Sequence, residues 1–137
     1  MITPEEILEV MDINAKKVCD KTFLQNRPNA ANVTLKTFIV ASLPYSSSNK
    51  TIGENDDWWI DMTVVFEIFV ADRKTNQNPL EFNNPKMKEL REGVFALFPI
   101  ISEGKFKIVR PRTVIPASSD GNGYHYTRIQ AKLTTLV

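Results

Sequence analysis

Apolar and mixed positions alternate along residues 58–72, WWIDMTVVFEIFVAD. Period-two alternation is the pattern of a strand with one face in a core. The even positions from 58 to 70 are all apolar, namely Trp58, Ile60, Met62, Val64, Phe66, Ile68 and Val70. The odd positions mix Trp59, Val65, Phe69 and Ala71 with Asp61, Thr63 and Glu67. We expect the even face to lie under helices, and the odd face to be a surface that the fold does not need.

The N-terminal segment carries the signals of an amphipathic helix. Thr3 is placed as the N-cap, Pro4 as the first helical residue and Glu6 as the capping-box partner. Apolar residues then recur at helical spacing, at Ile7, Leu8, Met11, Ala15, Val18 and Cys19. We expect the helix to end between Cys19 and Phe23. Because Cys19 lies on the apolar stripe, we expect it to be a buried structural thiol rather than a nucleophile.

A second helix is predicted at residues 85–98, after Asn84 as N-cap and with Pro85 in the first turn. Its buried stripe is expected to consist of Met87, Leu90, Val94, Leu97 and Phe98. Gly93 inside a helix costs about 1 kcal/mol relative to alanine. We therefore expect a close packing partner at that position.

Three further strands are predicted, at residues 33–43, 105–116 and 124–137. Residues 45–57 are polar and are expected to form a long hairpin loop. Residues 117–123 contain DG and NG in succession, which indicates a turn.

The predicted fold class is α+β, with the element order α-β-β-α-β-β in a single domain over residues 1–137. Hairpin-type connections join each strand pair and favour antiparallel pairing. We therefore expect an antiparallel, at most mixed, sheet of about four strands with both helices on one face.

Composition is that of an ordinary globular protein, with 42% hydrophobic and 24% charged residues. No apolar run approaches the roughly 20 residues of a membrane span, and no secretory signal is seen, so we expect a cytoplasmic protein without a membrane partner. Charge is unevenly distributed: residues 1–72 carry 6 Lys+Arg against 11 Asp+Glu, and residues 73–137 carry 11 against 5. The two signs either mix on the folded surface or form opposite poles that favour head-to-tail stacking of copies.

Catalytic and metal-binding motifs are absent from the sequence, so we expect no enzyme activity, cofactor or metal. His125 is the one candidate for general base chemistry near neutral pH, with Asp61 or Ser118 as candidate partners. A histidine satisfied at the end of a sheet is the simpler interpretation.

Basic residues are frequent in the last strands, at Lys105, Lys107, Arg110, Arg112, Arg128 and Lys132. Tyr124 and Tyr126 are expected on the same strand face as Arg128 and Lys132, and such a face can stack single-stranded bases. No RNA-recognition motif is present and the net charge is only +1, so nucleic acid is not expected as a specific ligand.

The order of elements resembles that of the tail-terminator and tail-completion (head–tail joining) proteins of long-tailed phages and related contractile particles. The matching segments are EEILEVMDINAKKV, WWIDMTVVFEIFVAD, NPKMKELREGVFALFP and YHYTRIQAKLTTLV. The resemblance covers most of the chain and is one of pattern, without a residue-by-residue signature.

The resemblance implies a structural protein, not an enzyme, that forms a ring, usually a hexamer, on the tail tube and joins it to the head. Its partners would be copies of itself and the tail-tube and head-completion proteins, first in the host cytoplasm and then in the virion. A ring needs two different patches on each subunit, and interfaces are enriched in aromatic residues and arginine. The residues expected at the oligomer interface are Trp59, Val65 and Phe69, or Tyr124, Tyr126 and Arg128. The alternative for Trp59 and Phe69 is cover by loops of the same chain.

A second hypothesis is a small-ligand-binding or enzymatic α+β domain of the cone-like kind. A curved sheet and helices would then enclose a pocket lined by His125, Asp61 and the tryptophans.

Overall fold

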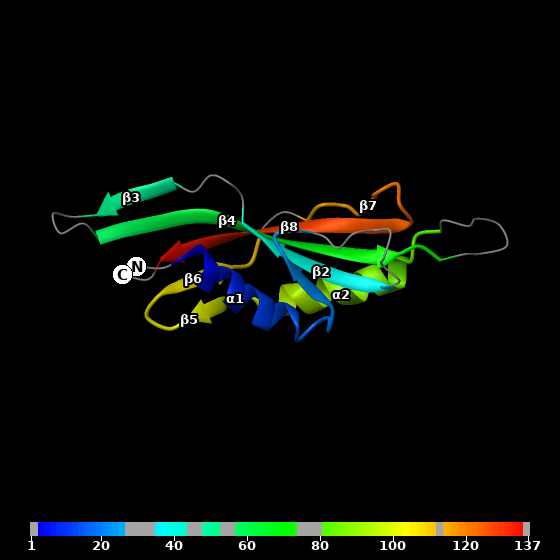
Figure 1. The fold of residues 1–137 in the computed structure, drawn as a ribbon, viewed down its shortest axis with the longest axis horizontal. Helices are drawn as coiled ribbons and strands as arrows, with labels where there is room; N and C mark the ends of the chain where they lie inside the picture. Colours follow the sequence, from blue (N-terminus) through cyan, green and yellow to red (C-terminus); the bar gives the residue numbers. More distant parts are fainter. Residues whose placement is uncertain are drawn as a thin grey trace.

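Two helices lie on one face of a mixed sheet whose central strands are β4 and β8 (Figure 1). The computed structural model describes residues 3–26, 35–43, 48–52, 57–73, 81–111 and 114–135, without the side chains of 48–52, 57–61 and 135. Within these residues the elements are α1 (Pro4–Ala15), β1 (Thr22–Leu24), β2 (Thr37–Ser42), β3 (Ser48–Ile52), β4 (Asp57–Ala71), α2 (Asn84–Leu97), β5 (Ile100–Ser102), β6 (Phe106–Val109), β7 (Ser118–Ser119) and β8 (Tyr124–Thr135). The fold class is therefore α+β, as the sequence predicts.

The sheet is organised around the long antiparallel pair β4–β8, which is in register from Asp61↔Thr134 to Ala71↔Tyr124. Hydrogen-bonded neighbours follow the order β1-β2-β4-β8-β6-β5, with β3 paired to β4 and β7 paired to β8. Only β1–β2 is parallel among these strand pairs of the described residues; the others are antiparallel.

The sheet is larger than the predicted four strands, and the order of its strands and helices differs from the prediction. β1 and β5 have 3 residues each, which is too short for an alternation pattern to identify them. The predicted loop at 45–57 contains β3, and the predicted turn at 117–123 contains β7. The predicted strand at 105–116 is reduced to β6.

Helix α1 starts with the predicted capping box, because Thr3 Oγ1 accepts from the Glu6 N–H at 3.2 Å and the Glu6 carboxylate accepts from the Thr3 N–H at 3.4 Å. It ends at Ala15, earlier than predicted, since the Lys17 N–H bonds to the Asn14 carbonyl three residues back and tightens the turn. Helix α2 is capped by Asn83 rather than by Asn84. Neither helix of the described residues has the length and apolar character needed to cross a membrane.

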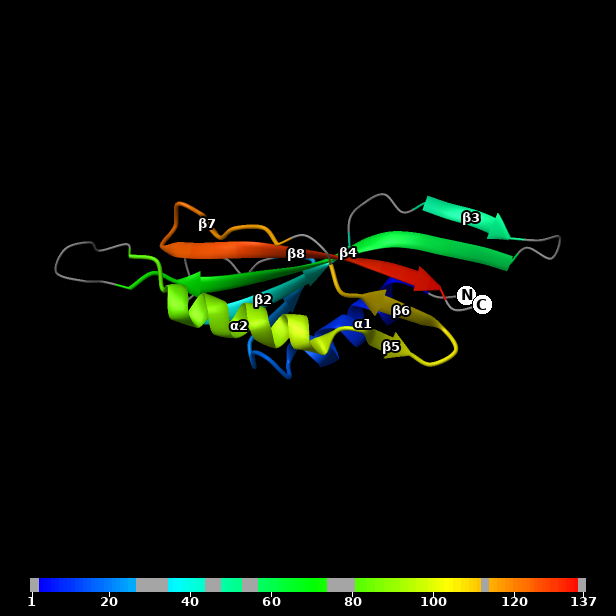
Figure 2. The same cartoon turned by 180° about the vertical axis from the view of Figure 1, so that it is seen from behind.

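The main core fills the space between the two helices and the sheet (Figure 2). The helices contribute Ile7, Met11, Ala15, Met87, Leu90 and Val94 to this core. On β4, the predicted even face is buried at Val64, Phe66, Ile68 and Val70. The side chains of Trp58 and Ile60 lie outside the described residues. Cys19 is also buried, as predicted.

A close approach between α2 and the segment after α1 explains the glycine inside α2. A Cβ added at Gly93 would lie 2.9 Å from Cγ1 of Val18. Real Cβ atoms essentially never come so close to another heavy atom. The close packing partner expected at Gly93 is therefore Val18.

The beginning of β4 extends beyond the helices as a two-stranded segment (Figures 1 and 2). There β3 pairs with residues 57–61 of β4, whereas the β8 ladder begins at Asp61 and the β2 ladder at Val65. We call this segment, residues 48–52 and 57–61, the arm.

Candidate interaction surface

The face of the sheet without helices is formed by the odd positions of β4 and their neighbours. Across β4–β8 the pairs on this helix-free face are Thr63–Lys132, Val65–Gln130, Glu67–Arg128 and Phe69–Tyr126. β2 adds Phe38 and Val40, because their neighbours Ile39 and Ala41 belong to the main core. The predicted division of β4 into two faces is therefore correct. The helix-free face has two ends with different character.

The aromatic end of the helix-free face is a second small core. Phe38, Val40, Phe69 and Tyr124 are buried there, with Tyr126 packed at the edge. The rings of Phe69 and Tyr126 stack with centroids 5.5 Å apart. The Tyr124 hydroxyl donates to the Leu35 carbonyl at 2.7 Å. This end is closed by the chain's own residues.

Phe69 is only 3% exposed, so the expectation that the fold does not need the odd face of β4 is wrong at this residue. The physical reason is register: Phe69 lies directly opposite Phe38 on β2 and Tyr126 on β8, and the three rings cover one another. Phe69 is therefore buried within the subunit, but by strand residues of β2 and β8 rather than by the loops that the alternative proposed.

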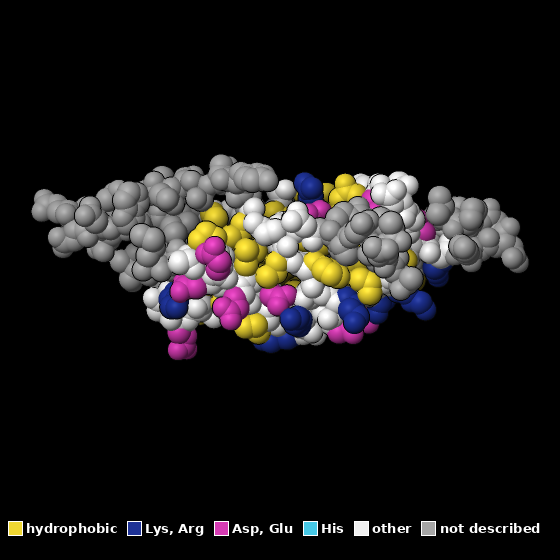
Figure 3. Space-filling model, viewed as in Figure 1, with side chains coloured by type: hydrophobic (Ala, Val, Ile, Leu, Met, Phe, Trp, Pro, Cys, Tyr) yellow, Lys and Arg dark blue, Asp and Glu magenta, His cyan; other side chains and the backbone are white. Residues whose placement is uncertain are grey.

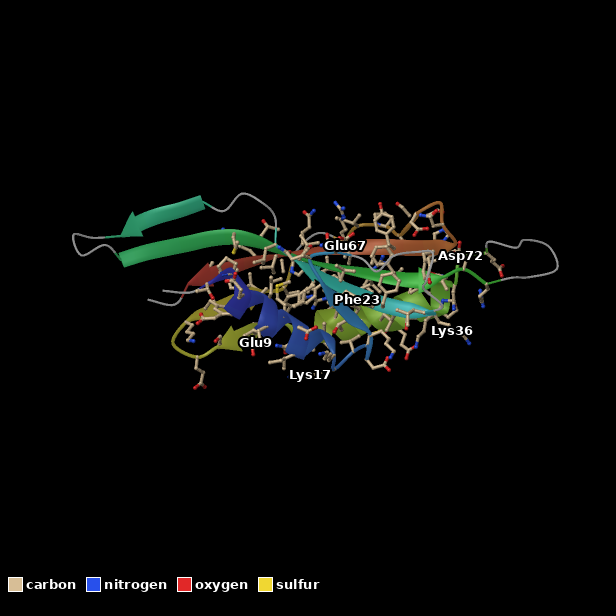
Figure 4. All side chains as sticks on the ribbon, in the orientation of Figure 1. Glu9, Lys17, Phe23, Lys36, Glu67 and Asp72 are labelled. Carbon is tan, nitrogen blue, oxygen red and sulfur yellow. The ribbon has the colours of Figure 1, made fainter. Side chains whose placement is uncertain are left out.

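The polar end of the helix-free face is exposed. Thr63, Gln130 and Lys132 are exposed, and Val65 is half-buried. Nε of Arg128 lies 3.3 Å from the Glu67 carboxylate, with 54% of the arginine side chain exposed. Figure 4 shows Glu67 near the middle of the molecule. An antiparallel sheet can leave such a polar face in water, so exposure alone does not mark a binding site.

The predicted interface residues with described side chains all lie on the helix-free face, but they are divided between its two ends. Phe69, Tyr124 and Tyr126 lie at the aromatic end, and Val65 and Arg128 at the polar end. The backbone of Trp59 belongs to the arm, opposite Lys50 of β3, and its side chain lies outside the described residues.

The basic residues of the last strands do not form one patch. Arg110 lies over the Phe95 ring of α2, 5.1 Å from its centroid, and Lys105 lies 3.9 Å from Glu6 of α1. Phe106, Ile108 and Leu133 are in the core. Because side chains alternate along a strand, their neighbours Lys107 and Lys132 lie on the helix-free face, where both are exposed. Arg112 lies outside the described residues. Figure 3 shows acidic side chains gathered over α1 on the visible face.

His125 forms a second candidate site at the opposite end from the arm. Its Nδ1 lies 2.5 Å from Oδ1 of Asp72, whose side chain is 3% exposed. The Phe82 ring stacks on the imidazole, with centroids 4.6 Å apart. Nε2 makes no hydrogen bond to another described residue, and the imidazole side chain is 18% exposed. Figure 4 places Asp72 toward this end of the molecule.

The partners suggested for His125 by the sequence are not its partners in the fold. Asp61 pairs with Thr134, at the other end of the β4–β8 ladder from His125. Ser118 pairs with Tyr126, which faces away from the helices, whereas His125 faces them. Asp72 follows β4 directly, but only the register of the ladder brings it to His125, and the sequence does not contain that register. Among the described residues, no group of three His, Cys, Asp or Glu side chains could hold a metal ion.

Neither the known protein-family models nor the curated proteins give a match to this chain.

Proposed function

We propose that the protein is a structural assembly subunit, a tail-terminator or head–tail joining protein that forms a homo-oligomeric ring on a tail tube. The observation that supports this proposal best is the arm. It continues β4 past the end of the β8 ladder, with β3 as its partner strand. A two-stranded hairpin is marginally stable by itself in water.

The residues of the arm make a partner favourable. Its strands contain Ile52, Trp58, Trp59 and Ile60. Tryptophan is one of the residue types enriched among those that carry binding energy in protein interfaces. A neighbouring subunit that covers the arm would bury apolar area and complete the hydrogen bonds of its strand edges.

The proposal is tested on tail tubes. The proposal predicts that a gene for a tail-tube protein lies near this gene. That tail-tube protein is polymerised, mixed with the purified chain and viewed by negative-stain electron microscopy. The proposal predicts a ring of protein at one end of each tube. Bare tube ends, or a gene neighbourhood without capsid, portal and tail-tube genes, would contradict it.

The second candidate function is small-ligand binding or catalysis at His125. It is favoured by one observation: Asp72 holds Nδ1 and orients the ring, and Nε2 makes no hydrogen bond to another described residue. This is how an acid orients the histidine in acid–base catalysis. A thermal-shift screen of acidic and phosphorylated metabolites tests it on the wild type and on His125→Asn. A ligand that stabilises only the wild type would support this function, and the absence of any such ligand would count against it.

A further inference from the structure

Among the described residues, the short strands β3 and β5 have free outer edges that lie on opposite sides of the sheet. Asp61 of β4 pairs with Ser48 of β3 and also with Thr134 of β8, so β3 and β8 lie on opposite edges of β4. β5 lies beyond β6, at the far end of the β8 side. No strand of the described residues pairs with the outer edge of β3 or of β5. Such edges carry unpaired N–H and C=O groups, which favour pairing with another strand.

The two edges have the geometry of a head-to-tail contact. β3 is antiparallel to β4, and the successive antiparallel pairs β4–β8, β8–β6 and β6–β5 make β5 antiparallel to β4 as well. β3 and β5 therefore run in the same direction. A second copy in the same orientation, displaced sideways, brings its β3 beside β5 as a parallel pair. Contacts between two different patches of this kind generate rings when the rotation closes.

Charge also matches across this contact. The arm contains Lys50 against Asp57 and Asp61, a net charge of −1. Residues 100–110 contain Glu103 against Lys105, Lys107 and Arg110, a net charge of +2.

The β5–β6 hairpin presents an apolar and basic surface to such a partner. Ile101 of β5 is 57% exposed. Lys107 is exposed and makes no ion pair with a described residue, and Lys105 lies 3.9 Å from Glu6 with 53% of its side chain exposed. An acidic strand that carries tryptophans is complementary to this surface in charge and in polarity.

We propose that the partner of the arm is a second copy of this chain, and that β3 of one copy adds to the outer edge of β5 in the next. The inference rests on the proposed function, because it names the two surfaces that join neighbouring subunits of the ring. Backbone pairing supplies affinity in this mode of recognition, and the charges set the register and suppress wrong partners.

A charge-reversal experiment tests the contact in the full-length chain. Lys105→Glu with Lys107→Glu reverses the charge of the hairpin, Asp57→Lys with Asp61→Lys reverses that of the arm, and a third protein combines both. Self-association is measured by sedimentation at micromolar concentration, and folding by thermal denaturation. Each reversal alone should weaken association about tenfold or more, and the combination should restore it to within about threefold of the wild type.

The matched control is Lys86→Glu with Lys88→Glu on α2. As in the hairpin, one lysine has an ion-pair partner, here Lys86 with Glu89, and the other has none among the described residues. This control should leave self-association unchanged. If the wild type associates and neither reversal weakens it, or the combination restores nothing, the contact is overturned while the proposed function stands. If the wild type neither associates nor binds tail tubes, both fail.

Discussion

The rings of Phe38 and Phe69 stack across the β2–β4 pair, with centroids 4.6 Å apart and planes 9° apart. Because both rings are buried within one chain, Phe69→Ser should lower the free energy of unfolding by about 3–5 kcal/mol, the cost of a large-to-small change in a core. Urea denaturation at neutral pH measures this. Val65→Ser, on the same face but half-buried, is the control and should cost about 1 kcal/mol. Equal losses at the two positions would contradict the closed aromatic end.

The pair His125–Asp72 should stabilise the end of the β4–β8 ladder. The Asp72 side chain is 3% exposed, so His125→Ala leaves a buried acid without its histidine partner. This substitution should lower the free energy of unfolding by about 3 kcal/mol. Adding Asp72→Asn to His125→Ala should recover part of that loss, because the amide is not charged. Thermal denaturation of the three proteins measures both effects. No recovery in the double variant would assign the loss to the stacking of His125 on Phe82 instead.

Asp12 should make stability depend on acid pH. Burial raises the pKa of Asp12, but the hydrogen bond from Thr22 at 2.6 Å and the Lys16 ammonium at 3.0 Å outweigh burial, so its pKa lies below the ordinary 3.8. A carboxylate with a lowered folded-state pKa contributes stability above its unfolded pKa, and this contribution is lost as pH falls through the folded pKa.

Asp12→Asn should therefore lower the free energy of unfolding by about 1 kcal/mol at neutral pH. The difference from the wild type should narrow as pH falls below 3.8. Urea denaturation across this range checks the prediction, with the exposed Glu9→Gln on the same helix as control. A difference that stays constant with pH would show that the Asp12 charge is not the cause.

Gly93→Ala should destabilise the protein even though alanine favours helices. The helix propensity gain is about 1 kcal/mol, but the new methyl would meet Val18, whose branched side chain has few other rotamers. In a Val18→Ala background the same substitution should be neutral or stabilising. A double-mutant cycle measured by thermal denaturation gives the coupling. A stabilising Gly93→Ala in the wild-type background would contradict the close approach.

The sequence predicts those parts of the fold whose signals are local. The capping box at Thr3 and Glu6, the stripe Met87–Leu90–Val94 and the alternation of β4 each depend on neighbours within a few residues, and each is found in the structure. β1, β3, β5 and β7 are short, and β3 has the polar sequence SNKTI, so their strand state depends on pairing with distant residues.

The candidate sites depend on register, which the sequence does not encode locally. The odd face of β4 looks uniform in the sequence, yet Phe69 is closed over by Phe38 and Tyr126 while Thr63 stays exposed. In the same way, the ladder brings Asp72 rather than Asp61 to His125. The resemblance to tail-terminator proteins stays a prediction.

The mass of the native particle shows whether copies of this chain assemble into a ring. Native mass spectrometry and sedimentation of the wild-type chain at micromolar concentration, alone and with the tail-tube protein that the proposal assigns to it, report that mass. A ring-forming subunit should give a closed species at a multiple of the 15.6 kDa chain, alone or on the tube. A single 15.6 kDa species in both samples would contradict it.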